Sequence, residues 1–135
     1  IGCHLFSFVN KNDVLKEATQ GATFLLNSPY GPDEVWDQLP RQVQEQIIEK
    51  EIDFWVVDGY RVASDAGLGR RISTVMQTCF FAIAGMLPKD EAIKKIKEAI
   101  HRTFIRKGEK IVEMNYAAVD GALANLHRVV VPGQV

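Results

Sequence analysis

Two short apolar runs constrain the fold of this chain more than any other feature. Residues 22–27 (ATFLLN) show no alternation of apolar and polar positions, and residues 52–58 (IDFWVVD) form a second run of the same kind. Such runs are typical of strands that are buried on both faces. Between them, an amphipathic helix is predicted over residues 41–50, because apolar residues recur at intervals of four, at Leu39, Val43 and Ile47.

The neighbouring segments extend the same pattern. A strand tail is predicted at residues 5–9, and a short helix that ends near Ala18 is predicted with a cap at Asn10, Asn12 or Asp13. Further helices are expected at residues 33–38 and 60–66. The resulting alternation of strands and helices is typical of a parallel α/β sheet.

The second half is predicted to be helical. Residues 71–86 are nearly all apolar, residues 89–106 are amphipathic, and residues 109–127 form a last helix. Residues 129–133 are predicted to lead away as an extended tail or linker. The predicted fold is α/β, with a parallel sheet of few strands in the first half and a helical C-terminal half packed on it, in a single domain over residues 1–135.

Composition and charge narrow the classes of function that this chain can have. Lys and Arg (16) nearly balance Asp and Glu (17), so the net charge of −1 argues against a broad nucleic-acid surface. No apolar run reaches the roughly 18 residues of a membrane span. Cys3 and Cys79 are too few for an iron–sulfur cluster, have no zinc spacing and do not indicate a secreted disulfide framework, which favours a cytoplasmic location. The chain starts at Ile1 without Met or a signal-peptide pattern, so we expect a piece of a longer protein.

The best candidate site is the turn GLGRR at residues 67–71, which leads directly into the apolar helix. Free backbone N–H groups, the helix dipole, the guanidiniums of Arg70 and Arg71, and the two hydroxyls at the start of the helix (Ser73 and Thr74) suit an anion, above all a phosphate. A solvated basic turn is the alternative. Neither a Walker-type motif nor a G-x-G-x-x-G after a strand is present, so motifs alone do not establish a nucleotide site.

Other polar residues give weaker signals. Asn115 is an amide within a helix, where it either binds a ligand or is an exposed polar position, and Ser28 and Tyr30 end a buried strand, where open α/β sheets tend to bind ligands. Asp58 and Asp65 are expected as caps, Cys79 as a buried core residue, and the histidines (His4, His101, His127) as structural. No set of residues combines a nucleophile, a base and an oxyanion donor, so we predict no catalytic or metal-binding residue here.

The chain resembles the gamma-type domain of pyruvate:ferredoxin (flavodoxin) oxidoreductases, in the single-chain form of that enzyme. The resemblance covers essentially all 135 residues and lies in the segments 13–15, 21–28, 67–72 (GLGRRI), 76–81 (MQTCFF), 92–94, 107–109 and 114–120 (MNYAAVD). It implies that the chain is the C-terminal two-thirds of that domain, because the family's Gly-rich nucleotide loop lies N-terminal to it.

The resemblance also implies a function. The family converts pyruvate and coenzyme A to acetyl-CoA and CO2, and reduces ferredoxin or flavodoxin. Thiamine diphosphate and 4Fe-4S clusters belong to other domains, which are then the partners of this one, and the full enzyme is expected to be a homodimer. The gamma-type domain is the one linked to coenzyme A.

Two coenzyme A contacts of the family would fall on Ser73 and Asn115, and Arg71 could add charge-assisted bonds to a phosphate. The family usually has Asn where this chain has Ser73, and a hydroxyl has less reach than an amide and lacks its paired donor and acceptor. Two alternatives stay open, a non-catalytic scaffold or interaction domain and a stand-alone nucleotide-binding α/β protein.

Overall fold

The computed structural model describes residues 2–3, 15–16, 18–69, 71–84 and 89–132. The chain forms two compact units. The sheet unit comprises Ile1–Asp58 and Leu126–Val135, and the helical unit comprises Gly59–Asn125. The mixed α/β class is confirmed, with the sheet in the first half of the chain and helices dominating the second. The single domain over residues 1–135 stays a prediction.

The sheet unit contains a four-stranded sheet in the order β1 (Gly2–Cys3), β2 (Thr23–Asn27), β3 (Asp53–Val57) and β4 (His127–Arg128). The first three strands are parallel, with Leu25 of β2 beside Trp55 of β3. Both apolar runs are therefore strands, and their parallel pairing is as predicted. The predicted strand tail at residues 5–9 and the predicted caps at residues 10, 12 and 13 lie outside the described residues.

The prediction that residues 129–133 lead away is wrong for the part that the structure describes. The strand β4 pairs antiparallel with β3, placing Arg128 beside Trp55. Val129 is buried, and its N–H donates to the carbonyl oxygen of Phe54 at 2.8 Å. The chain returns to the sheet because β3 would otherwise be an edge strand with unpaired backbone groups, and because Val129 adds apolar area to the core.

The core of the sheet unit joins the sheet to two helices, α2 (Val35–Gln38) and α3 (Arg41–Glu49). At its centre the rings of Phe24 and Phe54 stack with centroids 5.4 Å apart. The buried apolar residues of this cluster are Leu15, Phe24, Leu26, Val35, Leu39, Val43, Ile47, Ile52, Phe54, Val56 and Val129. The intervals of four that predict α3 thus mark its buried face, which includes Val43 and Ile47.

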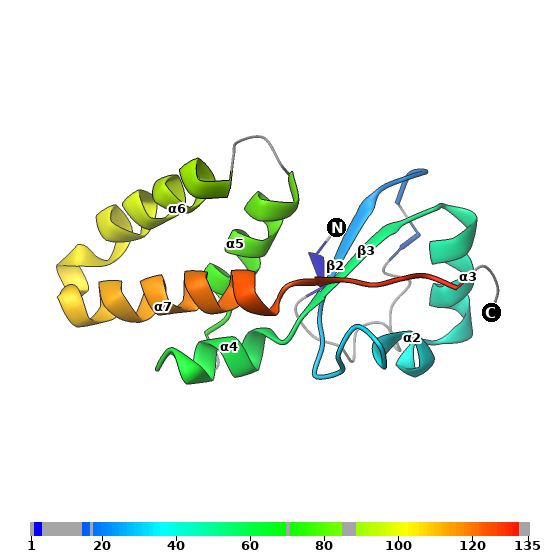
Figure 1. Ribbon diagram of the computed structural model, residues 1–135, viewed down its shortest axis with the longest axis horizontal. Coiled ribbons are helices and arrows are strands. Elements are labelled where there is room, and N and C mark those ends of the chain that lie inside the picture. The colour runs from blue at the N-terminus through cyan, green and yellow to red at the C-terminus, as the bar shows by residue number, and fades with distance from the viewer. Residues whose placement is uncertain (1, 4–14, 17, 70, 85–88, 133–135) are drawn as a thin grey trace. The chain divides into compact units, whose positions relative to one another are not determined.

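The helical unit consists of α4 (Gly59–Asp65), α5 (Ser73–Ala84), α6 (Lys89–Phe104), the short 3-10 helix η1 (Ile105–Lys107) and α7 (Glu109–Asn125). Within this unit α7 packs against α4, α5 and α6 (Figure 1). The four predicted helices are confirmed, with shifts of a few residues at their ends. None of the described helices is both long enough and apolar enough to cross a bilayer.

Candidate functional site

The Gly-rich turn begins as the C-terminal cap of α4. The N–H of Gly67 donates to the carbonyl of Ser64 at 3.0 Å, and the N–H of Leu68 donates to the carbonyl of Ala63 at 2.8 Å. This pair of bonds is the Schellman motif, which requires a left-handed residue that glycine provides, here Gly67 with φ of 86°. Leu68 is buried and anchors the turn in the core.

The carbonyl of Leu68 then holds Arg71. It accepts from the backbone N–H of Arg71 at 3.2 Å and from the side-chain Nε at 2.9 Å. Arg71 itself is exposed, whereas Arg70 lies outside the described residues. The turn therefore presents a fixed guanidinium two residues before Ser73, the exposed first residue of α5.

Asn115 lies on α7 and is 3% exposed, so it is not an exposed polar position. Its Nδ2 donates to the carbonyl of Ile111 at 2.9 Å, and its Oδ1 accepts from the hydroxyl of Thr74 at 2.7 Å. The bond from Nδ2 to Ile111 turns the amide so that Oδ1 faces Thr74. Because an amide oxygen only accepts, the Thr74 hydroxyl is the donor of the second bond. Asn115 therefore reaches the beginning of α5 through Thr74.

A groove of about 850 Å³ lies between α5 and α6 and starts at Ser73 and Thr74. We call it the α5–α6 groove. Its residues are Ser73, Thr74, Gln77, Thr78, Phe80 and Phe81 of α5, and Lys95, Ile96, Ala99, Ile100, Thr103 and Phe104 of α6. Of the three predicted contacts, Ser73 lines the groove and Asn115 is bonded to a lining residue, whereas Arg71 is not among the lining residues.

The contact of Thr74 with Asn115 is the feature of the site that sequence reasoning missed. A single threonine in the first turn of a helix carries no periodic or spacing signal, and only the tertiary contact with α7 singles it out. The weak signal that was available is Asn115, a buried amide in a helix interior, which needs a partner because an unsatisfied buried polar group is costly.

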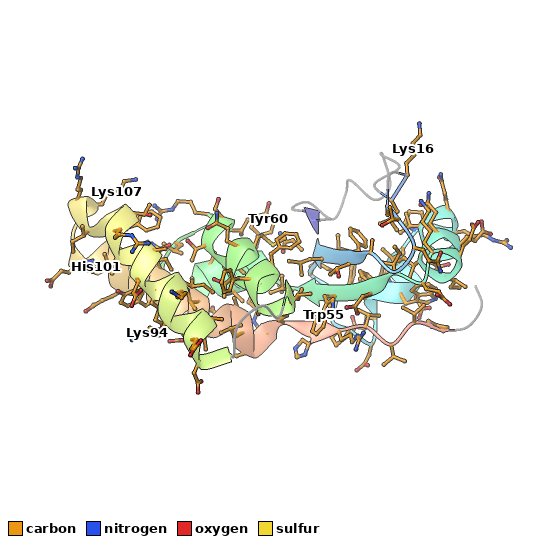
Figure 2. The ribbon with its side chains drawn as sticks, turned by 90° about the horizontal axis from the view of Figure 1, so that it is seen from above. Lys16, Trp55, Tyr60, Lys94, His101 and Lys107 are labelled. Atoms are coloured by element: carbon orange, nitrogen blue, oxygen red, sulfur yellow. The ribbon has the colours of Figure 1, made fainter. Side chains whose placement is uncertain are left out.

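The other polar candidates are local or structural. Ser28 is buried, and its hydroxyl accepts from the N–H of Tyr30 at 2.9 Å, which closes a turn at the end of β2. His101 of α6 and His127 of β4 are exposed, and the side chain of His101 projects outward like those of Lys94 and Lys107 (Figure 2). Within the described ranges, no group of three or more His, Cys, Asp and Glu residues is placed to hold a metal ion.

Cys79 is buried, as predicted, and burial raises the pKa of its thiol from 9.0 to about 12. The unfolded chain loses this proton near pH 9 while the folded chain keeps it, so this thiol makes the free energy of unfolding fall as the pH rises above 9. The slope is at most about 1.4 kcal/mol per pH unit.

Replacing Cys79 with alanine should make the free energy of unfolding depend less on pH above 9. The cavity left by the smaller side chain should lower that free energy by a similar amount at every pH. Urea unfolding of both proteins between about pH 8 and 10.5 measures the two slopes. Equal slopes would show that the thiol ionises as easily in the folded chain as in the unfolded one.

Comparison with known proteins places this site in a family. Residues 3–124 match the model of the pyruvate ferredoxin/flavodoxin oxidoreductase family. The chain belongs to this family. The pyruvate-flavodoxin oxidoreductase of Rhodospirillum rubrum is 53% identical over 133 residues, which are 98% of this chain and 11% of the relative. The pyruvate:ferredoxin oxidoreductase of Moorella thermoacetica is 42% identical over 132 residues, which are 98% of this chain and 11% of the relative.

A further relative, the pyruvate dehydrogenase [NADP(+)] of Cryptosporidium parvum, is 39% identical over 127 residues, which are 93% of this chain and 7% of the relative. The chain thus spans about a tenth of the length of the oxidoreductases that it matches. The family match includes the turn, the whole of α5 and α6, and Asn115, so the candidate site lies entirely within it.

Proposed function

We propose that this chain serves as the coenzyme A-side part of a 2-oxoacid:ferredoxin or flavodoxin oxidoreductase. In this function it binds the acyl acceptor and contacts neighbouring domains, while thiamine diphosphate and the iron–sulfur clusters are held elsewhere in the enzyme. The family membership and the resemblance around residues 67–81 and 114–120 support this assignment.

One observation carries the proposal within this chain. Ser73 and Asn115 are far apart in sequence, yet the bond of 2.7 Å between Thr74 and Asn115 brings α7 to the beginning of α5. Ser73 and Thr74 line the same end of the groove, and Arg71 precedes them in a turn that Leu68 holds in place. This gathers a cation and hydroxyl groups at the N-terminus of a helix, which suit a phosphorylated ligand.

The role of each residue follows from its contacts. Arg71 is exposed and supplies charge to a phosphate, and Ser73 offers a hydroxyl at the helix N-terminus. Asn115 has both amide atoms bonded within the protein. We therefore assign it the role of orienting the Thr74 hydroxyl, and not that of binding adenine directly. In this function the chain binds and orients the acceptor and supplies no group for proton transfer.

Replacing Asn115 with alanine in the full enzyme should raise the KM for coenzyme A by about 5- to 10-fold, because Thr74 loses the acceptor that orients it. The measurement is steady-state kinetics at varied coenzyme A, with cluster absorbance and thiamine diphosphate content recorded in parallel.

The matched control is Asn125→Ala. Asn125 is on the same helix and makes the same kind of bond to the carbonyl four residues earlier, at 2.7 Å, but it is exposed. That variant should keep the wild-type KM. An Asn115→Ala enzyme with an unchanged KM for coenzyme A would remove this residue from the site.

A further inference from the structure

The two units of this chain carry opposite net charges. The sheet unit has 5 Lys and Arg against 10 Asp and Glu, whereas the helical unit has 11 against 7. Within the helical unit the positive charge is concentrated in residues 94–110, which contain 7 Lys and Arg and only 2 Glu. A chain that is nearly neutral as a whole therefore has one strongly basic stretch, which runs along α6 to the beginning of α7.

The fold gathers the last four of these cations where the chain passes from α6 to α7. Arg102 lies in the last turn of α6, Arg106 and Lys107 lie in η1, and Lys110 lies in the first turn of α7. Gly108 turns the chain between η1 and α7 with φ of 107°, which glycine adopts readily. The side chain of Lys107 projects outward at this end (Figure 2). We use the name basic corner for Arg102, Ile105, Arg106, Lys107 and Lys110.

Interactions within the chain do not account for these cations. All four are exposed, and among the described residues none of them forms an ion pair with a carboxylate. The negative end of the α6 dipole favours Arg102 and the cations of η1, but Lys110 lies at the beginning of α7, where a cation is unfavourable. The electrostatics of the helices therefore explain only part of the cluster.

An apolar residue lies among the cations. Ile105 is 38% exposed and is one of three large apolar side chains that are exposed among the described residues. The Lys107 ammonium lies 5.9 Å from the ring centroid of Phe104, so this ring borders the same patch. Protein interfaces combine an apolar centre with arginine and a polar rim, whereas nucleic acid would engage the cations through its phosphates and leave Ile105 unused. The basic corner therefore fits an acidic protein surface.

The size of the basic corner indicates where that surface is. A stable interface between separate proteins uses about 20–30 residues on each side, several times more than the corner offers. A smaller patch is enough when its partner belongs to the same polypeptide, because the tether gives an effective concentration on the order of millimolar. This chain spans 11% of its relatives, so most of such an enzyme consists of other domains.

We propose that the basic corner docks on an acidic face of another domain of the same enzyme. In this contact Ile105 enters an apolar depression, and the four cations pair with carboxylates around it. The inference goes beyond the proposed function and rests on the family membership. It uses none of the residues that we assign to coenzyme A binding, so it holds or fails independently of that site.

Cross-linking in the full enzyme tests the ion pairs directly. A water-soluble carbodiimide joins a lysine amine to a carboxylate that touches it, forming an amide while the reagent takes up the released water and becomes a urea. Mass spectrometry should find Lys107 or Lys110 joined to an Asp or Glu outside residues 1–135. The yield should fall by at least about threefold when the salt concentration rises from about 20 mM to about 0.5 M, because salt screens exposed ion pairs.

Charge reversal provides a second measurement in the full enzyme. Arg106→Glu should raise the rate at which acetic anhydride acetylates Lys110 by at least about threefold, because the corner leaves its partner. A carboxylate near Lys110 would by itself slow acetylation, since it favours the charged ammonium, so a faster rate reports the loss of the contact.

The matched control is Lys94→Glu. Lys94 is exposed on α6 outside the basic corner, and its replacement changes the net charge by the same amount. This variant should leave the acetylation rate of Lys110 within about 1.5-fold of wild type. Circular dichroism of both variants confirms that their helices are formed.

Three results would overturn the docking proposal. One is a pattern in which Lys107 and Lys110 form no cross-link, or form cross-links only to carboxylates within residues 1–135 of either subunit. Another is an acetylation rate of Lys110 that Arg106→Glu leaves unchanged. The third is an equal rise in Lys94→Glu, because the effect would then follow net charge alone. The KM of Asn115→Ala for coenzyme A bears only on the proposed function, so the two proposals can fail separately.

Discussion

Replacing Phe54 with alanine is expected to lower the free energy of unfolding of the sheet unit by about 3–5 kcal/mol. Phe54 is 1% exposed, and its ring stacks on that of Phe24 at the centre of the core. Alanine would remove the apolar contact area and leave a cavity between β2, β3 and their covering helices. This loss is a large part of the total stability of a domain of ordinary size.

Tryptophan fluorescence in a urea titration measures this change selectively. The two tryptophans of the chain, Trp36 and Trp55, both belong to the sheet unit, so their emission follows its unfolding. Val130 is an apolar residue of the same unit that is 90% exposed, and Val130→Ala should alter stability by less than about 0.5 kcal/mol. Similar midpoints for the two variants would mean that the stacked rings do not form the core of the unit.

Replacing Gly67 with valine should destabilise the helical unit by about 2–4 kcal/mol. The backbone here has φ of 86°, a left-handed conformation that a β-branched residue adopts poorly. A Cβ at this position would also lie 3.1 Å from Cε of Met114, so the end of that side chain would have to move by a few tenths of an ångström.

Gly69 provides the matched control. It also has a positive φ, 63°, but an added Cβ would meet no atom within 4 Å. Gly69→Val should therefore cost only the conformational part, about 1–2 kcal/mol. Far-ultraviolet circular dichroism during urea unfolding compares the two, because most of the helix is in the helical unit. Equal losses would show that Met114 yields freely and that packing at Gly67 contributes nothing.

The elements that the sequence predicted share a strong local signal. The runs at 22–27 and 52–58 are mostly apolar, and the later helices have regular spacing, so burial and periodicity were enough to identify them. The strand β4 was missed because it is only two polar residues long, His127 and Arg128, and forms by pairing with β3. Pairing of this kind is a tertiary effect that leaves no trace in a short segment.

The candidate site also combines residues that a local sequence signal reveals with a contact that only the tertiary structure shows. Gly67 and Arg71 were visible because glycine next to a basic pair is a turn signal, and the capping geometry of the turn agrees with it. Whether the turn binds an anion stays a prediction. The bond between Thr74 and Asn115 joins residues 41 positions apart, so no local pattern reveals it.

The pairing of β4 with β3 has a consequence for how this chain is assembled. Val56 of β3 pairs with His127 of β4 on the neighbouring strand. The polypeptide therefore leaves the sheet unit after Asp58 and returns at Leu126 to pair with the strand that it left. Topologically, the residues from Gly59 to Asn125 are an insertion into what is otherwise a plain β-hairpin. The helical unit is therefore connected at both of its ends to two adjacent strands, so a shortened chain in which a turn replaces residues 59–125 should still allow β3 and β4 to pair.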